Sequence, residues 1–306
     1  MLTAVPPLTS RGAGPRIADR VPTGWDDQPY ARFTIQPISP TIGAEIGGIS
    51  LAEPLDEELH LELNRALLEW KVIFFRDQHL TGAQQAAFAR HWGPLEAHPF
   101  IKLRTSTQPE DAPEVVRLEK GVNTKGTENI GHSDVTWREC PSLGSVLRAI
   151  ELPDVGGDTL WSDMGAAYDC LTDEVKERID GLVAVHDWIN TFGRGMDPAK
   201  REALRPDFPP IEHPVVRTHP VTGQKALYVN RGFTRRILGL PGDESEAVLH
   251  YLYDHMESPL WQCRFRWTER AVAFWDNRCV QHRAMWDYWP HTRSGNRVTV
   301  IGDRPV

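Results

Sequence analysis

The chain has 306 residues, of which 40% are hydrophobic and 25% are charged, so it can bury a sizeable core and has neither a fibrous nor a disordered composition. Its formal net charge of −8 argues against nucleic acid and against an anionic membrane surface as partners. Its four cysteines are widely spaced and no apolar stretch reaches about 18 residues, which argues against a thiolate zinc site and a membrane span and favours a cytoplasmic location.

The N-terminal region, residues 1–30, is rich in proline and glycine. Such a composition favours an extended, poorly ordered arm. Residues 31–306 are then predicted to form a single catalytic domain, because this length fits one large domain better than several small ones.

Helical patterns come next in chain order. Apolar residues from Asp56 to Trp70 repeat on one helical face, and the run from Val72 to Phe75 is typical of a short buried strand. Thr81 followed by Gln84 forms a capping-box pattern that predicts a second helix, closed by Gly93 and Pro94.

Further helices are indicated later in the chain. One is expected to begin near Asp163. Another is predicted to open at Asp243 with Glu246 in capping-box spacing, and to continue through apolar residues at helical spacing until Pro259.

Short strands are predicted between these helices. Their expected ranges are Glu114–Leu118, Ser145–Ile150, Leu182–His186, Ala226–Val229, Gln262–Trp267, Ala271–Trp275 and Arg297–Ile301. Many short strands with a few helices outside them favour a mainly β protein with a sandwich or jelly-roll core. Strands and helices do not alternate regularly, which argues against a Rossmann-type enzyme.

A candidate metal site begins with His132 and Asp134, which are separated by one residue. In an extended strand such residues point to the same face, so an imidazole and a carboxylate could reach one metal ion. Such a pair also arises by chance, and a structural role stays open on this evidence alone.

A third possible ligand is His282, which follows the apolar strand that ends at Trp275 and the polar turn after it, so we expect it at a strand end. Two imidazoles and one carboxylate on one face of an octahedral ion leave positions open for a cosubstrate and O2, as in non-haem Fe(II) oxygenases. The same donors would also accept Zn(II) or Mn(II), so the ligand set does not fix the metal.

Several motifs resemble those of the taurine dioxygenase (TauD/TfdA) family of Fe(II)- and 2-oxoglutarate-dependent enzymes, from about Thr34 to the C-terminus. They are GHSDVTW at 131–137, GGDTLW at 156–161, HPVVRTHPVTG at 213–223, ALYVNRGFTRRI at 226–237 and WDNRCVQH at 275–282. The resemblance implies a double-stranded β-helix (jelly-roll) core with flanking helices. It also implies that His132, Asp134 and His282 are the catalytic iron ligands, with 2-oxoglutarate, O2 and a small molecule as reactants.

The resemblance further implies a binding site for 2-oxoglutarate. Thr159 and Arg293 match the family residues that hold the carboxylate remote from the metal. The assignment is chemically reasonable, since a guanidinium forks onto a carboxylate with two charge-assisted hydrogen bonds and a hydroxyl adds a third.

Substrate contacts are also implied by the resemblance. Arg297 is similar to the family arginine that holds the substrate sulfonate, and His98 to a second contact for this anion. Phe192 and Phe233 match aromatic positions that wall the pocket, and Val135 is assigned to the same pocket. Core packing is an alternative role for the two phenylalanines.

Two departures from the family pattern bear on the substrate. Ile101 stands where taurine-handling members have a tyrosine, and Glu128 stands where they have an asparagine. The loss of a hydroxyl at Ile101 favours a less polar or longer substrate, whereas Glu128 could contact a cationic amine. The two inferences point in different directions and put taurine itself in question.

The function favoured by these residues is hydroxylation of a small anionic substrate, with a sulfonate as the leading candidate, which would yield sulfite and an aldehyde. An alkyl sulfate, an aryloxyalkanoate, another carboxylate or a biosynthetic intermediate is the alternative. A zinc hydrolase or a non-catalytic metal-binding barrel would need no site for 2-oxoglutarate. We expect a homo-oligomer, either a dimer or a tetramer.

Overall fold

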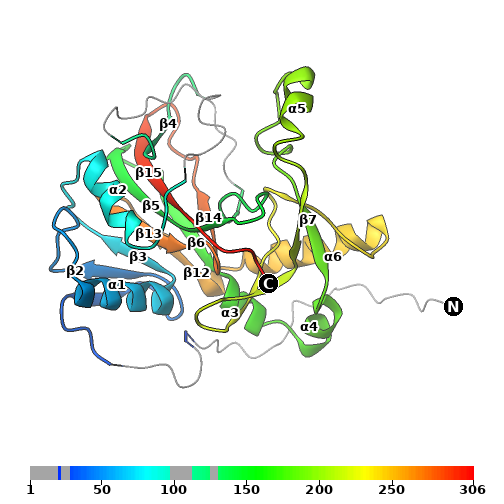
Figure 1. Cartoon of the computed structure of the whole chain (residues 1–306), viewed down its shortest axis with the longest axis horizontal. Helices are drawn as coiled ribbons and strands as arrows, with labels where there is room; N and C mark the ends of the chain where they lie inside the picture. The colour runs from blue at the N-terminus through cyan, green and yellow to red at the C-terminus, as the bar shows by residue number, and fades with distance from the viewer. Residues whose placement is uncertain (1–19, 22–27, 97–111, 125–129) are drawn as a thin grey trace.

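The computed structural model describes residues 20–21, 28–96, 112–124 and 130–306 (Figure 1). The strands of its large sheet are Thr34–Pro37 (β1), Ala44–Gly47 (β2), Val72–Phe75 (β3), Val116–Lys120 (β4), Ser142–Glu151 (β5), Val272–Asp276 (β13) and Arg293–Ile301 (β15). Their order in the sheet is β1-β2-β3-β13-β5-β15-β4. Strands that are neighbours in this sheet thus come from both ends of the domain.

Three smaller sheets complete the β structure of the described residues. One contains Gln262–Phe265 (β12), Thr159–Asp163 (β6) and Val280–Ala284 (β14), in that order. The others contain Thr234–Ile237 (β11), Val183–His186 (β7) and Ile211–Pro214 (β8), and Lys225–Leu227 (β10) with Val216–Thr218 (β9).

The helices are Glu57–Trp70 (α1), Gly82–Arg90 (α2), Met164–Asp169 (α3), Asp173–Ile179 (α4), Pro198–Leu204 (α5) and Gly242–Met256 (α6), with a 3-10 helix at Pro259–Trp261. Figure 1 shows α1 and α2 on the outer side of the large sheet. The predicted mainly β architecture with flanking helices is confirmed.

Strand β3 explains how two layers pack against one sheet. The Phe74 ring of β3 stacks on Phe265 of β12 at a centroid distance of 4.0 Å, so the face of the large sheet that carries Phe74 meets the small sheet β12-β6-β14. Its other face turns Phe75 toward Phe88 of α2, 6.1 Å away between ring centroids. Because side chains alternate along a strand and both faces are covered, the run VIFF is buried throughout. The two facing sheets form the expected jelly-roll core.

The helix starts test the capping predictions. Asp56 caps α1 by accepting a hydrogen bond from the Leu59 amide at 2.8 Å, and the capping box of Thr81 and Gln84 is present at α2. The helix predicted near Asp163 is α3, which that carboxylate caps. The capping box predicted at Asp243 is wrong, because α6 begins one residue earlier and no side chain caps it.

The start of the chain is described only in part. Most of the predicted arm, residues 1–30, lies outside the described residues. Arg20 is described, and it forms an ion pair of 2.7 Å with Glu69 and lies over the ring of Trp70. No helix within the described ranges is long and apolar enough to cross a membrane.

Candidate functional site

The two histidines of the predicted metal site lie opposite each other across an isolated antiparallel bridge. The amide of His132 donates to the carbonyl of His282 at 3.1 Å, and the amide of His282 donates back at 2.8 Å. His282 lies within β14 rather than at a strand end, and β14 pairs with β6. This pairing holds the imidazole rings 4.4 Å apart between centroids.

Asp134 reaches the same point by a turn, not by the extended strand that the spacing predicted. The strand prediction is wrong, because a turn begins at Asp134 and Val135 has a positive φ of 48°. The Asp134 amide donates to the side-chain oxygen of Asn277 at 3.1 Å, which fixes the turn. Local hydrogen bonding has replaced the regular alternation of a strand.

The ligand atoms of the three residues converge. Asp134 Oδ1 lies 3.8 Å from His132 Nε2 and 4.0 Å from His282 Nε2, and all three atoms lie within 4.8 Å of one another. His132 Nδ1 lies 3.0 Å from the carbonyl of Ile130 and donates to it, which leaves a lone pair on Nε2. The structure therefore brings the predicted triad together with one donor atom of each residue facing inward.

Charge around the triad favours its metal-binding protonation state. Burial raises the pKa of Asp134, but Arg297, His282 and His132 outweigh it and hold this pKa well below its usual range. Burial, with the neighbouring His132, lowers the pKa of His282 to about 3. An ionised carboxylate and a neutral imidazole at neutral pH are the forms in which these groups bind a divalent metal, so the donor set fits Fe(II).

A second layer of side chains positions the carboxylate. Ser145 of β5 donates to Asp134 Oδ2 at 2.8 Å, so that only Oδ1 faces the histidines. Asn277 donates to Ser145 Oγ at 3.2 Å and accepts from the indole of Trp275 at 2.9 Å. Sequence patterns did not identify Ser145 or Asn277. The polar turn of WDNR, buried directly after an apolar strand, was the available signal for Asn277.

Thr159 and Arg293, the predicted 2-oxoglutarate residues, also lie together. Arg293 Nη2 donates to Thr159 Oγ1 at 3.2 Å. The indole of Trp267 donates to the same oxygen at 3.0 Å, and the Arg293 guanidinium lies 5.5 Å from its ring centroid. Trp267 was missed as a site residue, because it was assigned only as the last residue of the predicted strand Gln262–Trp267 and no motif contains it.

Arg297 lies on β15, four positions after Arg293, so the two side chains leave the same face of the strand. Its Nη1 donates to Asp134 Oδ1 at 2.8 Å. Its Nε is buried and has no hydrogen-bond partner among the residues described. A guanidinium thus lies beside the metal-facing oxygen with a donor still to be satisfied.

Glu96 is a further charged group near Arg297 that was not predicted. Burial raises its pKa, while Arg138 and Arg297 act in the opposite direction. Arg138 forms an ion pair with it at 2.5 Å. Arg138 therefore balances the charge of Glu96. The charge of Arg297 is then balanced by Asp134 or by a bound anion.

An apolar wall stands beside His132. Phe233 contacts the His132 ring edge-on at 5.9 Å between centroids, and Phe192 stacks on Phe233 at the same distance. Val135 belongs to the same buried cluster, together with Trp137 and Trp188. Phe192, Phe233 and Val135 thus pack as a small apolar core beside His132, and their predicted contact with a substrate stays a prediction. The other predicted substrate residues, His98, Ile101 and Glu128, lie outside the described residues.

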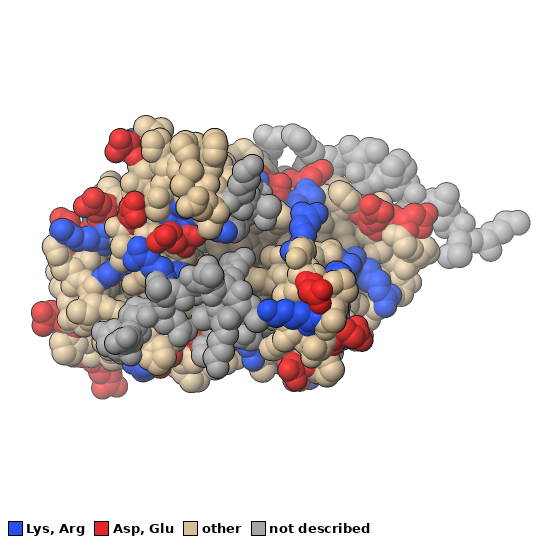
Figure 2. All heavy atoms as spheres, turned by 90° about the horizontal axis from the view of Figure 1, so that it is seen from above, with Lys and Arg blue, Asp and Glu red and all other residues tan. Residues whose placement is uncertain are grey.

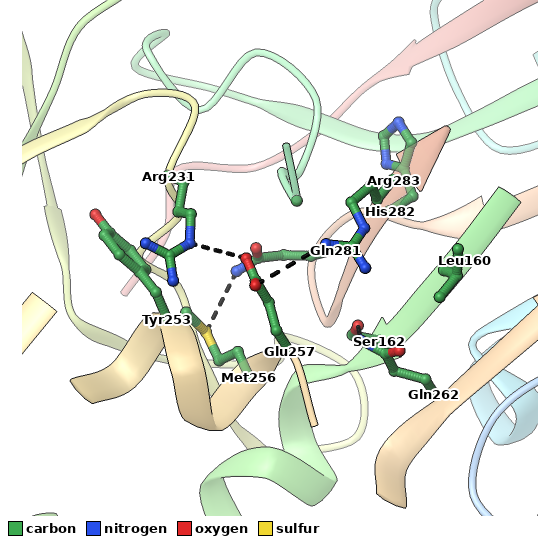
Figure 3. Close-up of a pocket in the computed structure, with 11 residues that line it drawn as sticks. Leu160, Ser162, Arg231, Tyr253, Met256, Glu257, Gln262, Gln281, His282 and Arg283 are labelled. Atoms are coloured by element: carbon green, nitrogen blue, oxygen red, sulfur yellow. Dashed lines mark hydrogen bonds and ion pairs between the residues drawn. The ribbon is translucent and has the colours of Figure 1, made fainter. Parts of the chain in front are cut away.

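Behind His282 lies a polar cluster formed by α6 and the neighbouring strands (Figure 3). Glu257 accepts from Arg231 Nε at 2.8 Å and lies 3.9 Å from Arg283 Nη1. Gln281 donates to the carbonyl of Val229 at 2.7 Å. These contacts fix both chain neighbours of His282 and so orient β14 at the site.

Comparison with known proteins gives matches over most of the chain. The profile of the family described as taurine catabolism dioxygenase TauD, TfdA family, matches residues 34–299. An alpha-ketoglutarate-dependent sulfate ester dioxygenase of Pseudomonas putida is 36% identical over 91% of this chain and 93% of its own length. An alkylsulfatase of Acinetobacter baylyi is 33% identical over 92% and 89%. The crystal structure of a taurine dioxygenase from Burkholderia xenovorans superposes with a TM-score of 0.77 at 34% identity, over 90% of this chain and 93% of that one.

Proposed function

Because the chain belongs to the taurine catabolism dioxygenase TauD/TfdA family, we propose that this Fe(II)- and 2-oxoglutarate-dependent dioxygenase hydroxylates the carbon that bears a sulfate ester or sulfonate group. The enzyme class follows from the family and from the alpha-ketoglutarate-dependent relatives. The choice of substrate rests on one observation, namely Arg297 at 2.8 Å from the metal-facing oxygen of Asp134.

The iron would be held by His132 Nε2, Asp134 Oδ1 and His282 Nε2, whose convergence supports this assignment. Iron, 2-oxoglutarate and O2 together supply the oxidising chemistry, with one oxygen atom entering the substrate C–H bond and the other entering succinate as CO2 leaves. The protein contributes the open coordination positions, the orientation of the reactants and the apolar wall that limits water.

Arg293 and Thr159 would bind the remote carboxylate of 2-oxoglutarate. Their contact of 3.2 Å places a guanidinium and a hydroxyl side by side, as a planar carboxylate requires. Trp267 supports the pair through its 3.0 Å hydrogen bond to Thr159. The hydroxyl already accepts from two donors, so its own proton is available for the cosubstrate.

Arg297 would bind the substrate oxyanion. A metal ion at Asp134 Oδ1 would supply the positive charge that Arg297 now provides, which frees the guanidinium for a second anion. A sulfate or sulfonate held there brings its neighbouring C–H bond toward the metal. Hydroxylation of that carbon gives an unstable product, which loses hydrogensulfate from an ester or hydrogensulfite from a sulfonate and leaves an aldehyde.

Sulfate esters are the first substrates to test, since two relatives with high coverage are named for sulfate ester or alkyl sulfate chemistry. Purified protein would receive Fe(II) and 2-oxoglutarate without oxygen, and the visible charge-transfer band would be recorded. Oxygen and a panel of alkyl sulfates, sulfonates and carboxylates would follow, with assays for succinate, sulfate and sulfite. Coupled succinate formation with only the carboxylates would reject the proposal while leaving the enzyme class intact.

The two arginines provide a crossed control. Arg293→Ala should chiefly raise the KM for 2-oxoglutarate, whereas Arg297→Ala should chiefly raise the KM for the organic substrate. Loss of one charge-assisted contact corresponds to a change of about tenfold or more. Exchanged effects would mean that the two arginine roles are reversed.

We further propose that the enzyme works in the cytoplasm as a homo-oligomer. All four cysteines lie in the described ranges and are free thiols, which suits a reducing compartment. Light scattering of the purified protein would test the oligomeric state, and a mass of one chain would reject it.

A further inference from the structure

A second basic region lies next to the proposed site, in a groove of about 630 Å³. Four arginines line it, namely Arg194, Arg201, Arg231 and Arg235, with Ile130 and Ile189 among the remaining residues. We call it the arginine groove. On the face seen in Figure 2, blue basic side chains stand beside a central hollow.

The charge of the arginine groove is unusual for this protein. The chain carries a formal net charge of −8, yet none of the described residues that line the groove is acidic. Arg231 is neutralised by Asp254 at 2.7 Å and by Glu257 at 2.8 Å. Arg194, Arg201 and Arg235 have no ion-pair partner within the part of the chain that the structure describes. Three like charges around one groove are stabilised when an anion binds between them.

Two residues that line the arginine groove contact His132, at atoms other than its metal-facing Nε2. The carbonyl of Ile130, a lining residue, lies 3.0 Å from His132 Nδ1. Gly232, another lining residue, lies so close that a Cβ there would stand 3.3 Å from His132 Cβ. Thr191 donates to the carbonyl of Gly232 at 2.6 Å and joins the two sides of the groove.

Thr191 and Gly232, which this hydrogen bond joins, are each followed in the chain by an aromatic residue of the apolar wall. Thr191 precedes Phe192, and Gly232 precedes Phe233, which contacts His132. The apolar wall and the arginine groove are therefore built from adjacent residues of the same two segments.

From this arrangement we propose that the arginine groove binds a second anionic group at the far end of the organic substrate. The preferred substrate would then be an elongated dianion, with a sulfate or sulfonate at Arg297, an apolar chain and a terminal carboxylate or similar anion in the groove. This inference rests on the proposed function, because it takes Arg297 as the partner of the first anion. The groove is far larger than taurine requires and lies within the usual size range of ligand sites, roughly 300–1,000 Å³.

The test compares n-alkyl sulfates with ω-carboxyalkyl sulfates of the same chain length, over a series of lengths, through the release of sulfate and succinate. The iron-loaded enzyme should favour the carboxylate-ended substrate by about tenfold in KM at the length that spans the two sites. In the double variant Arg194→Gln, Arg235→Gln this preference should fall toward unity.

Arg236→Gln is the matched control, since Arg236 is an exposed neighbour of Arg235 that does not line the groove. It should keep the preference of the unmodified enzyme. Turnover of alkyl sulfates without any preference for a terminal carboxylate would overturn the proposed anion site in the arginine groove and leave the proposed function standing. An equal loss of preference in Arg236→Gln would show that the preference comes from general surface charge, and it would also overturn the anion site in the groove.

A binding measurement separates this outcome from failure of the proposed function. If no sulfate or sulfonate is oxidised, octanedioate would be titrated calorimetrically into the Fe(II)- and 2-oxoglutarate-loaded protein without oxygen. Binding that weakens in the double variant but not in Arg236→Gln would support an anion site in the groove. Binding that is equal in all three proteins would overturn it.

Discussion

Two clusters of this protein have nearly the same composition but differ in the contacts of their donor atoms. The triad of His132, Asp134 and His282 is one, and His219 with Asp276 and Cys279 is the other. In both, one donor atom per residue lies within 4.8 Å of the others. The difference lies in what each donor atom already binds.

In the second cluster the donor atoms are occupied. Asp276 accepts from the Arg278 amide at 2.9 Å, from its Nε at 2.8 Å and from its Nη2 at 2.6 Å. His219 Nδ1 accepts from the amides of Val221 and Thr222, so its Nε2 donates to Asp276 at 3.1 Å. Burial, together with Asp276, raises the pKa of Cys279 well above its usual value, so its thiol is protonated.

The comparison shows that residue type and proximity do not define a metal site. Metal binding needs a lone pair aimed at the centre and a cluster that accepts positive charge. In the first cluster both imidazole Nε2 atoms face the centre, and Asp134 Oδ1, which faces them, accepts a hydrogen bond from Arg297. The second cluster already contains its cation as Arg278. It ties the turn after β13 to the loop that carries His219.

Replacing the acidic residue of the first cluster should have the largest effect on function. Asp134→Ala removes the proposed anionic ligand, so iron binding and coupled succinate formation should fall below detection, while the circular dichroism spectrum stays that of a folded protein. Metal analysis after gel filtration and the 2-oxoglutarate charge-transfer band measure the change. Persistent turnover would remove Asp134 from the metal site.

The equivalent change in the second cluster should act on stability instead. Asp276→Asn keeps the shape of the side chain but leaves the buried Arg278 without its counter-charge, which costs about 3 kcal/mol of the free energy of unfolding. Urea titration measures this loss. The folded fraction should still bind one iron per chain, and loss of iron at unchanged stability would contradict the distinction between the clusters.

A smaller effect is expected from the support of Asp134. Ser145→Ala removes the 2.8 Å hydrogen bond to Oδ2 and should lower iron affinity by about 10- to 100-fold. Ser142→Ala is the control in the same strand, because the buried Ser142 hydroxyl has no hydrogen-bond partner among the described residues. Competition with a chelator measures both affinities. Equal losses would show that Ser145 acts through general packing of β5.

Sequence reasoning found the parts of the fold that depend on local patterns. Helix α1 and the capping box of α2 follow from periodicity and cap chemistry, and both are present. Strand β14 was not predicted, since its residues VQHRA have no apolar alternation and are buried only by pairing with β6. Long-range pairing of this kind leaves no mark in a short window of sequence.

The candidate site shows the same division. His132, Asp134 and His282 were identified from donor types and motifs, but their meeting point depends on an isolated bridge and a turn that spacing did not predict. Ser145 donates one hydrogen bond to Asp134, 11 residues earlier in the chain, and Trp267 donates one to Thr159, 108 residues earlier. Buried serine and tryptophan side chains are common in any core, so only the folded structure marks these two.

Lowering the pH should cause a modest loss of stability through the second cluster, which contains Asp276. Arg278 and His219 outweigh the burial that raises the pKa of Asp276 and hold this pKa well below its usual value. Its stabilising contribution is therefore complete above the unfolded pKa of about 4 and decreases as the pH falls below that value, by about 1 kcal/mol at pH 3. Urea unfolding at pH 7 and pH 3 should show this loss in the unmodified protein and less of it in Asp276→Asn.

The smallest effect is expected at Cys279, and it tests most directly whether the second cluster excludes a metal. If a metal bound there, the thiolate would be the strongest ligand, and its removal would lower the metal content. Because the thiol is protonated and only 8% of the residue is exposed, Cys279→Ala should instead leave one iron per chain and reduce the free energy of unfolding by about 1 kcal/mol. A drop from two metal ions to one in this variant would show that the hydrogen bonds of Asp276 and His219 open to admit a metal, and the contrast between the two clusters would then be one of affinity.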